Sequence, residues 1–248
     1  MKRFFTFIIC IVTACAFFCS GCNTPSNTVP KRCPVSLPGY SFPACSVEER
    51  QICRLDAGDP SAPLVLYIGG IHGNEKTGIS LCWDLAEGIA DSSIDISGKR
   101  VIIIPVFNPD GTAANTRYNI NGVDLNRNYP AENRQVSKVN GLEPVNQPES
   151  RFIYELILDE KPEKIIVLHE ALDCIDYDGP GKQLAEQMAA VCPLEVKKLG
   201  ARPGSLGAWA GETLGIPIIC VEFSEADSKL SDGQLWQRYK EMMLAPLD

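Results

Sequence analysis

Four stretches of the chain are apolar without alternation, at residues 62–70, 99–107, 163–170 and 216–223. Their length and their content of Val, Ile and Leu are typical of strands that are buried on both faces. Between and after them lie four stretches with apolar residues at helical spacing, at 77–90, 148–160, 181–191 and 232–244. Strands that alternate with helices in this way predict an α/β fold, a mostly parallel or mixed twisted sheet flanked by helices on both faces.

Residues 108–147 interrupt this order. The segment is full of Asn, Gly and Pro and keeps no sustained hydrophobic period. Loops of this length are uncommon in compact domains and usually have a function. We therefore expect the segment to contribute to a site.

Composition narrows the class of protein and of partner. The chain has 248 residues, of which 45% are hydrophobic and 22% charged, the profile of one globular domain with a full core. The net charge is −8, and it becomes about −10 if Lys2 and Arg3 are removed. An acidic protein of this kind is a poor match for nucleic acid or anionic lipid, so neither is expected as the main partner.

The N-terminus predicts export. A short basic start and an apolar run over residues 4–18 are followed at once by Ser20, Gly21 and a polar tail, which is typical of a signal peptide rather than a spanning helix. Cys22 directly after "SG" resembles the lipidation site of bacterial lipoproteins. Cys15 is a second candidate, and plain secretion without a lipid is the alternative.

These features divide the chain into three expected parts: a signal peptide at 1–21, a tether at 22–39 and an enzyme domain at 40–248. The tether is rich in Asn, Thr, Ser and Pro. We expect an exported protein of the cell envelope that faces the periplasm or the exterior and meets the membrane only through its N-terminal lipid. The oligomeric state is left open.

Cysteine usage adds a prediction about pairing. Of 11 cysteines, seven follow Cys22: Cys33, Cys45, Cys53, Cys82, Cys174, Cys192 and Cys220. Outside the cytoplasm the closely spaced Cys33, Cys45 and Cys53 are the best candidates for a disulfide. Cys82 and Cys220 stand in apolar patterns and are expected in the core.

Polar side chains stand where the apolar strands end. His72 and Glu75 follow the first strand, His169 ends the third, and Glu222 ends the fourth. Ligands of open α/β sheets bind outside the carboxyl ends of the strands, so these side chains can converge. Two imidazoles and one carboxylate form a known zinc set, and a further acid can take a proton from water. Alone, the pair in "HGNE" is a weak signal, because a histidine after a strand is more often an ordinary loop or core residue than a metal ligand.

The long loop carries Arg117, Asn126 and Arg127 among few apolar residues. A solvated surface loop is one interpretation. Arginine, however, grips carboxylates with two parallel hydrogen bonds and stabilises oxyanions. Beside a zinc site, these residues indicate a peptide-like substrate with a free carboxylate.

The motifs together resemble a known family. "HGNE", "NPDG", "NGVDLNRNYP", a later strand-terminal histidine and "VEF" occur in the order seen in the zinc carboxypeptidase superfamily, over about residues 67–223. "LDCIDYDGP" and "PGSLGAWAGETLGIPIICVEF" look closer still to its branch of murein peptide amidases. Enzymes of that branch cut the bond between γ-D-glutamate and meso-diaminopimelate in cell-wall peptides.

The resemblance implies a zinc carboxypeptidase-like fold and one zinc ion with three ligands: His72, Glu75 and His169. It implies that Glu222 is the general base that activates water and that Arg117 stabilises the oxyanion. Asn126 and Arg127 would bind the carboxylate of the released residue. The expected activity is zinc-dependent hydrolysis of murein peptides.

The chain departs from the family pattern in two places. Many relatives place a tyrosine on a mobile loop before the Ser/Gly segment, but "KKLGARPGS" has Ala201 and Arg202 there. Glu170 follows the zinc histidine, either as a helix-start or surface carboxylate or as part of the pocket. Beside it lies an acidic cluster, one member of which we expect to meet the amine of the diaminopimelate side chain: Asp173, Asp176 and Asp178.

Two other functions remain open at this stage. One is a carboxypeptidase or deacylase of the same superfamily that acts on ordinary peptides or N-acyl amino acids. The deacylase branch usually lacks the "NPDG" and "DLNRNYP" pairing. The other is a non-catalytic lipoprotein that binds wall peptides, although such a protein would have no need of Glu222.

Overall fold

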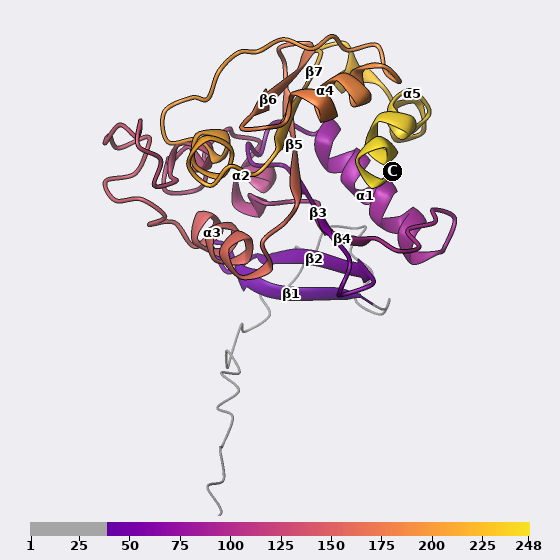
Figure 1. The fold of residues 1–248 in the computed structure, drawn as a ribbon. Helices are drawn as coiled ribbons and strands as arrows, with labels where there is room; N and C mark the ends of the chain where they lie inside the picture. The colour runs from indigo at the N-terminus through magenta and orange to yellow at the C-terminus, as the bar shows by residue number, and fades with distance from the viewer. Residues whose placement is uncertain (1–38) are drawn as a thin grey trace, which may run out of the picture.

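The computed structural model describes residues 39–248. The predicted signal peptide, Cys22, Cys33 and all but the last residue of the predicted tether lie outside this range. At the centre is a seven-stranded sheet with the order β1-β2-β4-β3-β5-β7-β6 (Figure 1).

The elements have the following bounds. The strands are β1 (Tyr40–Cys45), β2 (Gln51–Gly58), β3 (Leu64–Gly69), β4 (Arg100–Ile104), β5 (Lys164–Glu170), β6 (Cys174–Asp178) and β7 (Ile218–Phe223). The α-helices are α1 (Thr77–Ala90), α2 (Pro109–Ala114), α3 (Pro148–Glu160), α4 (Lys182–Ala189) and α5 (Asp232–Leu244). Shorter turns of helix are η1 (Leu125–Arg127), the π-helical η2 (Gly207–Thr213), η3 (Asp227–Lys229) and η4 (Ala245–Leu247).

The sheet is mixed, with a parallel centre and antiparallel edges. The strands β4, β3, β5 and β7 run parallel to one another. The hairpin β1–β2 joins antiparallel on one side, and β6 pairs antiparallel with β7 on the other. The four central strands are those that the apolar runs predict, so the predicted fold class is confirmed. The edge strands lack continuous apolar runs because they are less completely buried or carry polar side chains.

Both faces of the sheet are covered. Along β3, Val65 and Tyr67 pack with α1, α4 and α5 on one face, while Leu66 and Ile68 pack with α3 and η2 on the other. Successive residues of a strand point to opposite faces, so a strand between two helical layers must be apolar at every position. The continuous runs in the sequence have this origin.

The register of the central strands aligns their carboxyl ends. His169 on β5 pairs with Glu222 on β7, and Gly69 at the end of β3 pairs with Leu168 on β5. Paired residues lie side by side on the same face of a sheet. Side chains far apart in the chain are thus brought to one edge.

The long segment 108–147 is held by side-chain hydrogen bonds rather than by regular structure. The Nδ2 of Asn128 donates to the carbonyl oxygens of Asn140 (3.0 Å) and Glu143 (3.1 Å) and to Oδ1 of Asn146 (3.0 Å). Its Oδ1 accepts from the hydroxyl of Ser150 at 2.6 Å. These bonds satisfy a buried polar side chain and fix the loop against α3.

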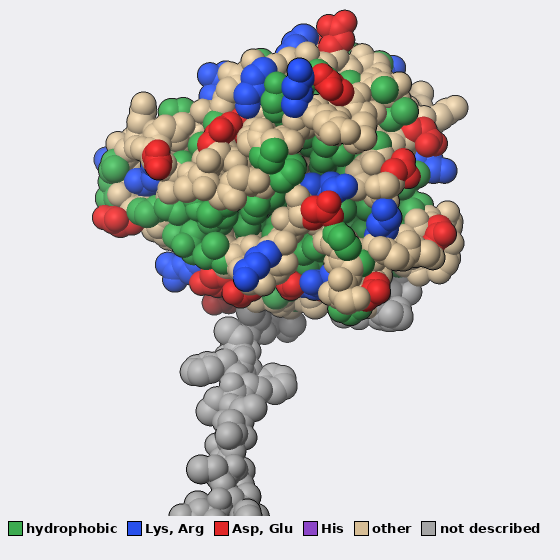
Figure 2. All heavy atoms as spheres, in the orientation of Figure 1, with side chains coloured by type: hydrophobic (Ala, Val, Ile, Leu, Met, Phe, Trp, Pro, Cys, Tyr) green, Lys and Arg blue, Asp and Glu red, His purple; other side chains and the backbone are tan. Residues whose placement is uncertain are grey.

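Acidic and basic side chains are interspersed over the face drawn in Figure 2. Within residues 39–248, no helix is both long enough and apolar enough to cross a membrane. Cys82 is fully buried on α1, as predicted. The predicted disulfide among Cys33, Cys45 and Cys53 stays a prediction, because Cys33 lies outside the described range.

Candidate metal centre

His72 and Glu75 lie on a tight loop between β3 and α1. Gly70 begins it with φ = +63°, a conformation that favours glycine, and the amide of Glu75 donates to the carbonyl of His72 at 3.1 Å. A Cβ at Gly73 would lie 2.0 Å from the carbonyl carbon of Gly111. Glycine at position 73 therefore lets the loop pack directly against the backbone of α2.

The "NPDG" motif supports this loop and has no direct part in the chemistry. Asn108 caps α2 by accepting from the amide of Gly111 at 2.9 Å, and its Nδ2 donates to the carbonyl of Ile71 at 3.3 Å. The carboxylate of Asp110 is buried and accepts from the hydroxyl of Ser46 at 2.7 Å. The motif thus joins the β3–α1 loop to α2 and to the β1–β2 hairpin.

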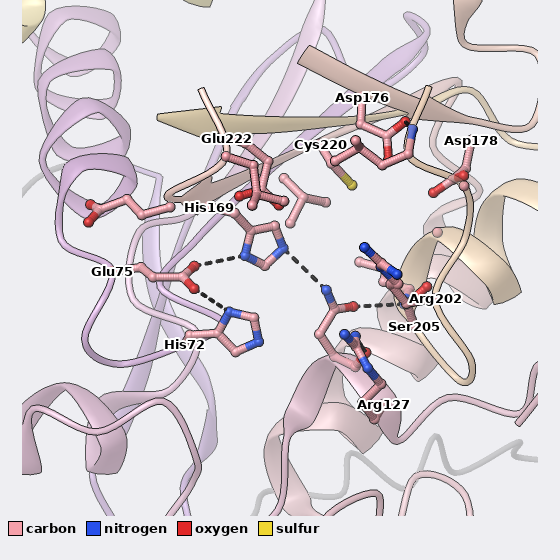
Figure 3. A pocket seen from close by; sticks show the side chains of 18 of the residues that line it. His72, Glu75, Arg127, His169, Asp176, Asp178, Arg202, Ser205, Cys220 and Glu222 are labelled. Atoms are coloured by element: carbon pink, nitrogen blue, oxygen red, sulfur yellow. Dashed lines mark hydrogen bonds and ion pairs between the residues drawn. The ribbon is translucent and has the colours of Figure 1, made fainter. Parts of the chain in front are cut away.

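The three predicted zinc ligands come together at the sheet edge (Figure 3). Oε1 of Glu75 lies 2.7 Å from Nδ1 of His72, and Oε2 lies 2.9 Å from Nδ1 of His169. One ligand atom from each residue lies within 4.8 Å of the others, and all three side chains are buried. Residues 94 positions apart in the chain thereby form one cluster.

Glu75 keeps its charge in this environment. Burial alone would raise the pKa of a carboxyl group, but the charges and hydrogen bonds of His169 and His72 lower the pKa of Glu75 to about 2. An ionised carboxylate between two imidazoles is a suitable set of donors for a divalent cation.

Asp124 lies beside Nε2 of His72, the outer ring nitrogen, which does not contact Glu75. Its Oδ1 lies 3.1 Å from Nε2 of His72 and also accepts from the amide of Asn126 at 2.9 Å, while its Oδ2 accepts from Nε of Arg117 at 3.1 Å. Burial opposes ionisation of Asp124, but His72 and the nearby arginines lower its pKa. A carboxylate on the outer nitrogen of a metal-binding histidine fixes the orientation of the ring. Sequence reasoning did not select Asp124, although it stands inside the quoted "NGVDLNRNYP".

The residues present fit a zinc ion. They supply two imidazole nitrogens and one carboxylate, the number and type of protein ligands found in several catalytic zinc sites. The partner on the outer nitrogen of His72 is a further property of such sites.

Glu222 faces the same cavity from β7 (Figure 3), next to His169 in the register of the sheet. Burial raises the pKa of Glu222, and the charge of His169 opposes that shift. A carboxylate whose pKa is raised toward neutrality is better suited to accept and return a proton than one on the open surface.

Arg117 and Asn126 lie beside the ligand cluster. Nη1 of Arg117 is 3.3 Å from Oε1 of Glu75, and more than a third of its side chain is exposed. The Nδ2 of Asn126 is 3.2 Å from Nε2 of His169, and its Oδ1 accepts from the amide of Leu206 at 2.9 Å. The structure therefore places both predicted residues within reach of anything bound in the cavity.

Arg127 is half-buried at the cavity, where the nearby charge of Asp124 acts on it without a direct ion pair. Its Nη1 donates to the carbonyl of Asn126 at 2.5 Å, and it forms no ion pair with any residue that the structure describes. Burial lowers the pKa of Arg127, which reflects the cost of holding a desolvated cation. A site that keeps such a group is prepared for an anionic ligand.

Comparison with known proteins identifies this arrangement. Residues 35–179 match the family described as "Zinc carboxypeptidase", which is more than half of the chain. The chain belongs to the zinc carboxypeptidase family. As predicted, it is a hydrolytic enzyme of the zinc metallopeptidase class.

Relatives within and around the family include amidases and carboxypeptidases. The chain is 30% identical over 181 residues to murein peptide amidase A of Escherichia coli strain K12, covering 66% of this chain and 72% of that protein. It is 34% identical over 134 residues to the carboxypeptidase N catalytic chain of Homo sapiens, covering 44% and 29%. The crystal structure of murein-tripeptide amidase MpaA from Escherichia coli O157 superposes with a TM-score of 0.68 at 24% identity, covering 84% of this chain and 92% of that one.

The cavity of this zinc carboxypeptidase has a volume of about 350 Å³ and is lined by all seven predicted site residues of the domain. Five further residues that line the cavity were not among the predicted site residues: Asp176, Asp178, Arg202, Ser205 and Cys220. Cys220 was predicted in the core, and it does pack against the core from β7. It is only partly buried, however, and it also lines the cavity.

Glu170 fits both of its sequence interpretations, because it lines the cavity and also acts as a helix-start carboxylate. Its Oε1 accepts from the amide of Thr77 at 2.6 Å, at the N-terminus of α1. The residue at the N-cap position of α1, Lys76, provides no side-chain cap. A carboxylate there satisfies a free amide and interacts favourably with the helix dipole. Glu170 thus connects the strand that carries His169 to the loop that carries Glu75.

Proposed function

We propose that this member of the zinc carboxypeptidase family is a murein peptide amidase that cleaves the bond between γ-D-glutamate and meso-diaminopimelate. The similarity to murein peptide amidase A, at 30% identity over 72% of that protein, supports this substrate class. The alternative within the family is a carboxypeptidase that acts on ordinary peptides.

The observation that carries the proposal is the half-buried Arg127, which has no ion-pair partner among residues 39–248. A guanidinium without a direct ion pair in a cavity favours a ligand that brings a carboxylate, and bidentate pairing with it would also orient that ligand. Arg127 shares the cavity with the ligand cluster and with Glu222. A substrate anchored by its terminal carboxylate would therefore present its last amide bond to the ligand cluster.

The proposed ligands of a single zinc ion are His72, Glu75 and His169. When bound there, zinc would polarise the scissile carbonyl and lower the pKa of water. The fit of the three side chains supports this assignment: they are buried, and their ligand atoms lie within 4.8 Å of one another.

Glu222 is proposed to take a proton from the attacking water and to return it to the leaving amine of diaminopimelate. Arg117, anchored through Asp124 and partly exposed, is proposed to stabilise the negative charge that develops on the carbonyl oxygen. Asn126 and Arg127 would hold the free carboxylate of the residue to be released. Each of these side chains then has one proposed role in catalysis or substrate binding.

We further propose that the domain works in the cell envelope, attached through a lipid on Cys22 after removal of residues 1–21. The support is the sequence pattern of the N-terminus. Fractionation of cells that produce the full chain, compared with a Cys22→Ser variant, tests this. Retention of both proteins in the soluble fraction would contradict the lipid anchor.

The activity is tested by mass spectrometry of murein tripeptide and tetrapeptide digests with the purified domain, zinc-loaded and chelated. We expect release of diaminopimelate from the tripeptide only with zinc. The Glu222→Gln variant should lose at least about 100-fold in rate, the lower range for loss of a general base.

Glu225→Gln is the matched control, because Glu225 is an exposed carboxylate three residues further along the chain. It should retain wild-type cleavage. Absence of cleavage by the zinc-loaded wild type, or equal cleavage by Glu222→Gln, would refute the proposal. Preferential removal of C-terminal residues from ordinary peptides would favour the carboxypeptidase alternative.

A further inference from the structure

One wall of the cavity is formed by the edge strand β6 together with β7. In their antiparallel register Cys174 pairs with Glu222, and Asp176 pairs with Cys220. Paired residues point to the same face, so Asp176 stands beside Cys220 on the face that carries Glu222. Two residues along a strand span about 7 Å, so this wall extends from the proposed base toward the inner end of the cavity. Figure 3 shows Asp176 and Cys220 on this wall.

Of the three carboxylates in the acidic segment, two are accounted for. Asp178 forms an ion pair with Nζ of Lys198 at 2.9 Å. Its Oδ2 lies so close to Gly207 that a Cβ there would be 1.9 Å away. Asp173 is exposed and does not line the cavity. Neither residue is therefore available to a ligand in the cavity.

Asp176 differs from both. Its side chain lines the cavity, and the residue is only 6% exposed. Oδ1 accepts from the amides of Tyr177 (2.8 Å) and Leu199 (2.9 Å), which fixes the carboxylate in place. Within the described part of the chain, Oδ2 has no hydrogen-bond partner and Asp176 forms no ion pair. The charge of Lys198 also acts on Asp176, but Lys198 is paired with Asp178, so the free oxygen of Asp176 can take a cation from a ligand in the cavity.

Arg202 faces the cavity from the loop before η2 (Figure 3). It is exposed, and no ion pair to it occurs within residues 39–248. Arg127 lies on the same side and is already assigned to the main-chain carboxylate of the substrate. Besides Arg117 and Arg127, the cavity therefore offers a third guanidinium and a carboxylate beyond the groups that the reaction needs.

We infer that Asp176 and Arg202 bind the far end of the released residue's side chain, with Asp176 on its ammonium group and Arg202 on its carboxylate. Such an end is zwitterionic, as in meso-diaminopimelate, whose side chain carries an amine and a carboxylate beyond three methylenes. A lysine side chain of equal length would satisfy only Asp176, and an apolar one would leave a buried carboxylate unpaired. This inference rests on the proposed function and makes it more specific.

Four tripeptides that differ only in the third residue separate the two contacts. The residues are meso-diaminopimelate, with both groups; lysine, with the amine only; 2-aminopimelate, with the carboxylate only; and norleucine, with neither. The measurement is kcat/KM of the zinc-loaded enzyme for each peptide. The wild type should prefer the lysine peptide to the norleucine peptide by roughly 10-fold or more, the range of a hydrogen bond to a charged group.

The Asp176→Asn variant keeps an oxygen for the two backbone amides and removes the charge. It should lower kcat/KM roughly 10- to 100-fold for the diaminopimelate and lysine peptides, and so reduce their preference over 2-aminopimelate and norleucine by that factor. Arg202→Gln should reduce the preference for diaminopimelate over lysine. Its effect should be roughly 2- to 5-fold, since Arg202 is exposed to solvent.

The matched controls are Asp173→Asn, on the same segment but outside the cavity, and Arg151→Gln on the surface of α3; both should keep the wild-type ratios. Cleavage of all four peptides with ratios unchanged in Asp176→Asn would overturn the inference and leave the proposed function intact. No cleavage of any peptide by the wild type would overturn the function itself. Should Asp176→Asn fail to fold, equal wild-type rates on lysine and norleucine peptides would still refute the role of Asp176.

Discussion

Asp124 provides a sharp test of the metal centre, because it touches the site without being one of the three ligands. Its carboxylate holds Nε2 of His72 at 3.1 Å and Nε of Arg117 at 3.1 Å. The substitution Asp124→Asn keeps one oxygen, which can still accept from the amide of Asn126, and removes the charge and one acceptor. The remaining oxygen still lies beside Nε2 of His72, but it is neutral and no longer anchored through Arg117, so it fixes the orientation of the His72 ring less firmly.

The expected result is zinc affinity weakened by about 10- to 100-fold, the usual effect of losing such a partner, which equals about 1.4 to 2.7 kcal/mol. A second effect acts in the opposite direction. Burial lowers the pKa of His72, but Asp124 and Glu75 raise it overall, so the substitution also weakens competition by protons. Raising the pH weakens competition by protons in both proteins, so the loss of orientation dominates in alkaline solution.

The assay is competition for zinc against a chromophoric chelator of known affinity at pH 8.5, with the fold monitored by circular dichroism. Asp159→Asn is the control, because Asp159 is an exposed aspartate on α3 away from the cavity. Unchanged zinc affinity in Asp124→Asn, or an equal loss in Asp159→Asn, would refute the reasoning.

Two further predictions follow from the environment of single carboxylates. Burial raises the pKa of Glu222, and a general base works when deprotonated, so kcat/KM should fall with decreasing pH at a midpoint above the pKa of an exposed glutamate, about 4.3. A pH–rate profile with the zinc content measured at each point checks this. A midpoint at or below about 4.3 would contradict it. Glu170→Ala should lower the free energy of unfolding, measured with urea, by about 1 kcal/mol, because it removes the hydrogen bond to the amide of Thr77. Glu170→Gln should lower it by less. Equal stability of the wild type and both variants would contradict the capping role of Glu170.

Sequence patterns predicted the parts of the fold in which one physical requirement dominates. The helices α1, α3 and α5 begin and end where the apolar period begins and ends, because each must cover the sheet with one face. The central strands were evident because burial on both faces leaves no place for polar residues. β6 was missed, since "CIDYD" turns its polar side chains toward the cavity and so shows no continuous apolar run.

The site residues that could be predicted are those that stand at the ends of strands or within the family motifs. His72, His169 and Glu222 could be expected at one edge of the sheet, since the carboxyl ends of parallel strands share that edge, and the family motifs then grouped them as one site. The roles of Asp124 and Cys220 depend on the direction of a side chain relative to residues far along the chain. No local pattern encodes that direction.

The position of β6 at the edge of the sheet separates two properties of the enzyme. His169 and Glu222 stand on strands with neighbours on both sides, where a change disturbs the whole sheet. Asp176 stands on the edge strand, which on its outer side has only an isolated bridge from Ile175 to Val196, and Asp176 borders the cavity. The side chains proposed to choose the substrate can thus be exchanged with less effect on the strands that perform the hydrolysis. We expect members of the family with this edge strand to diverge in the residue they release more readily than in the bond chemistry they use.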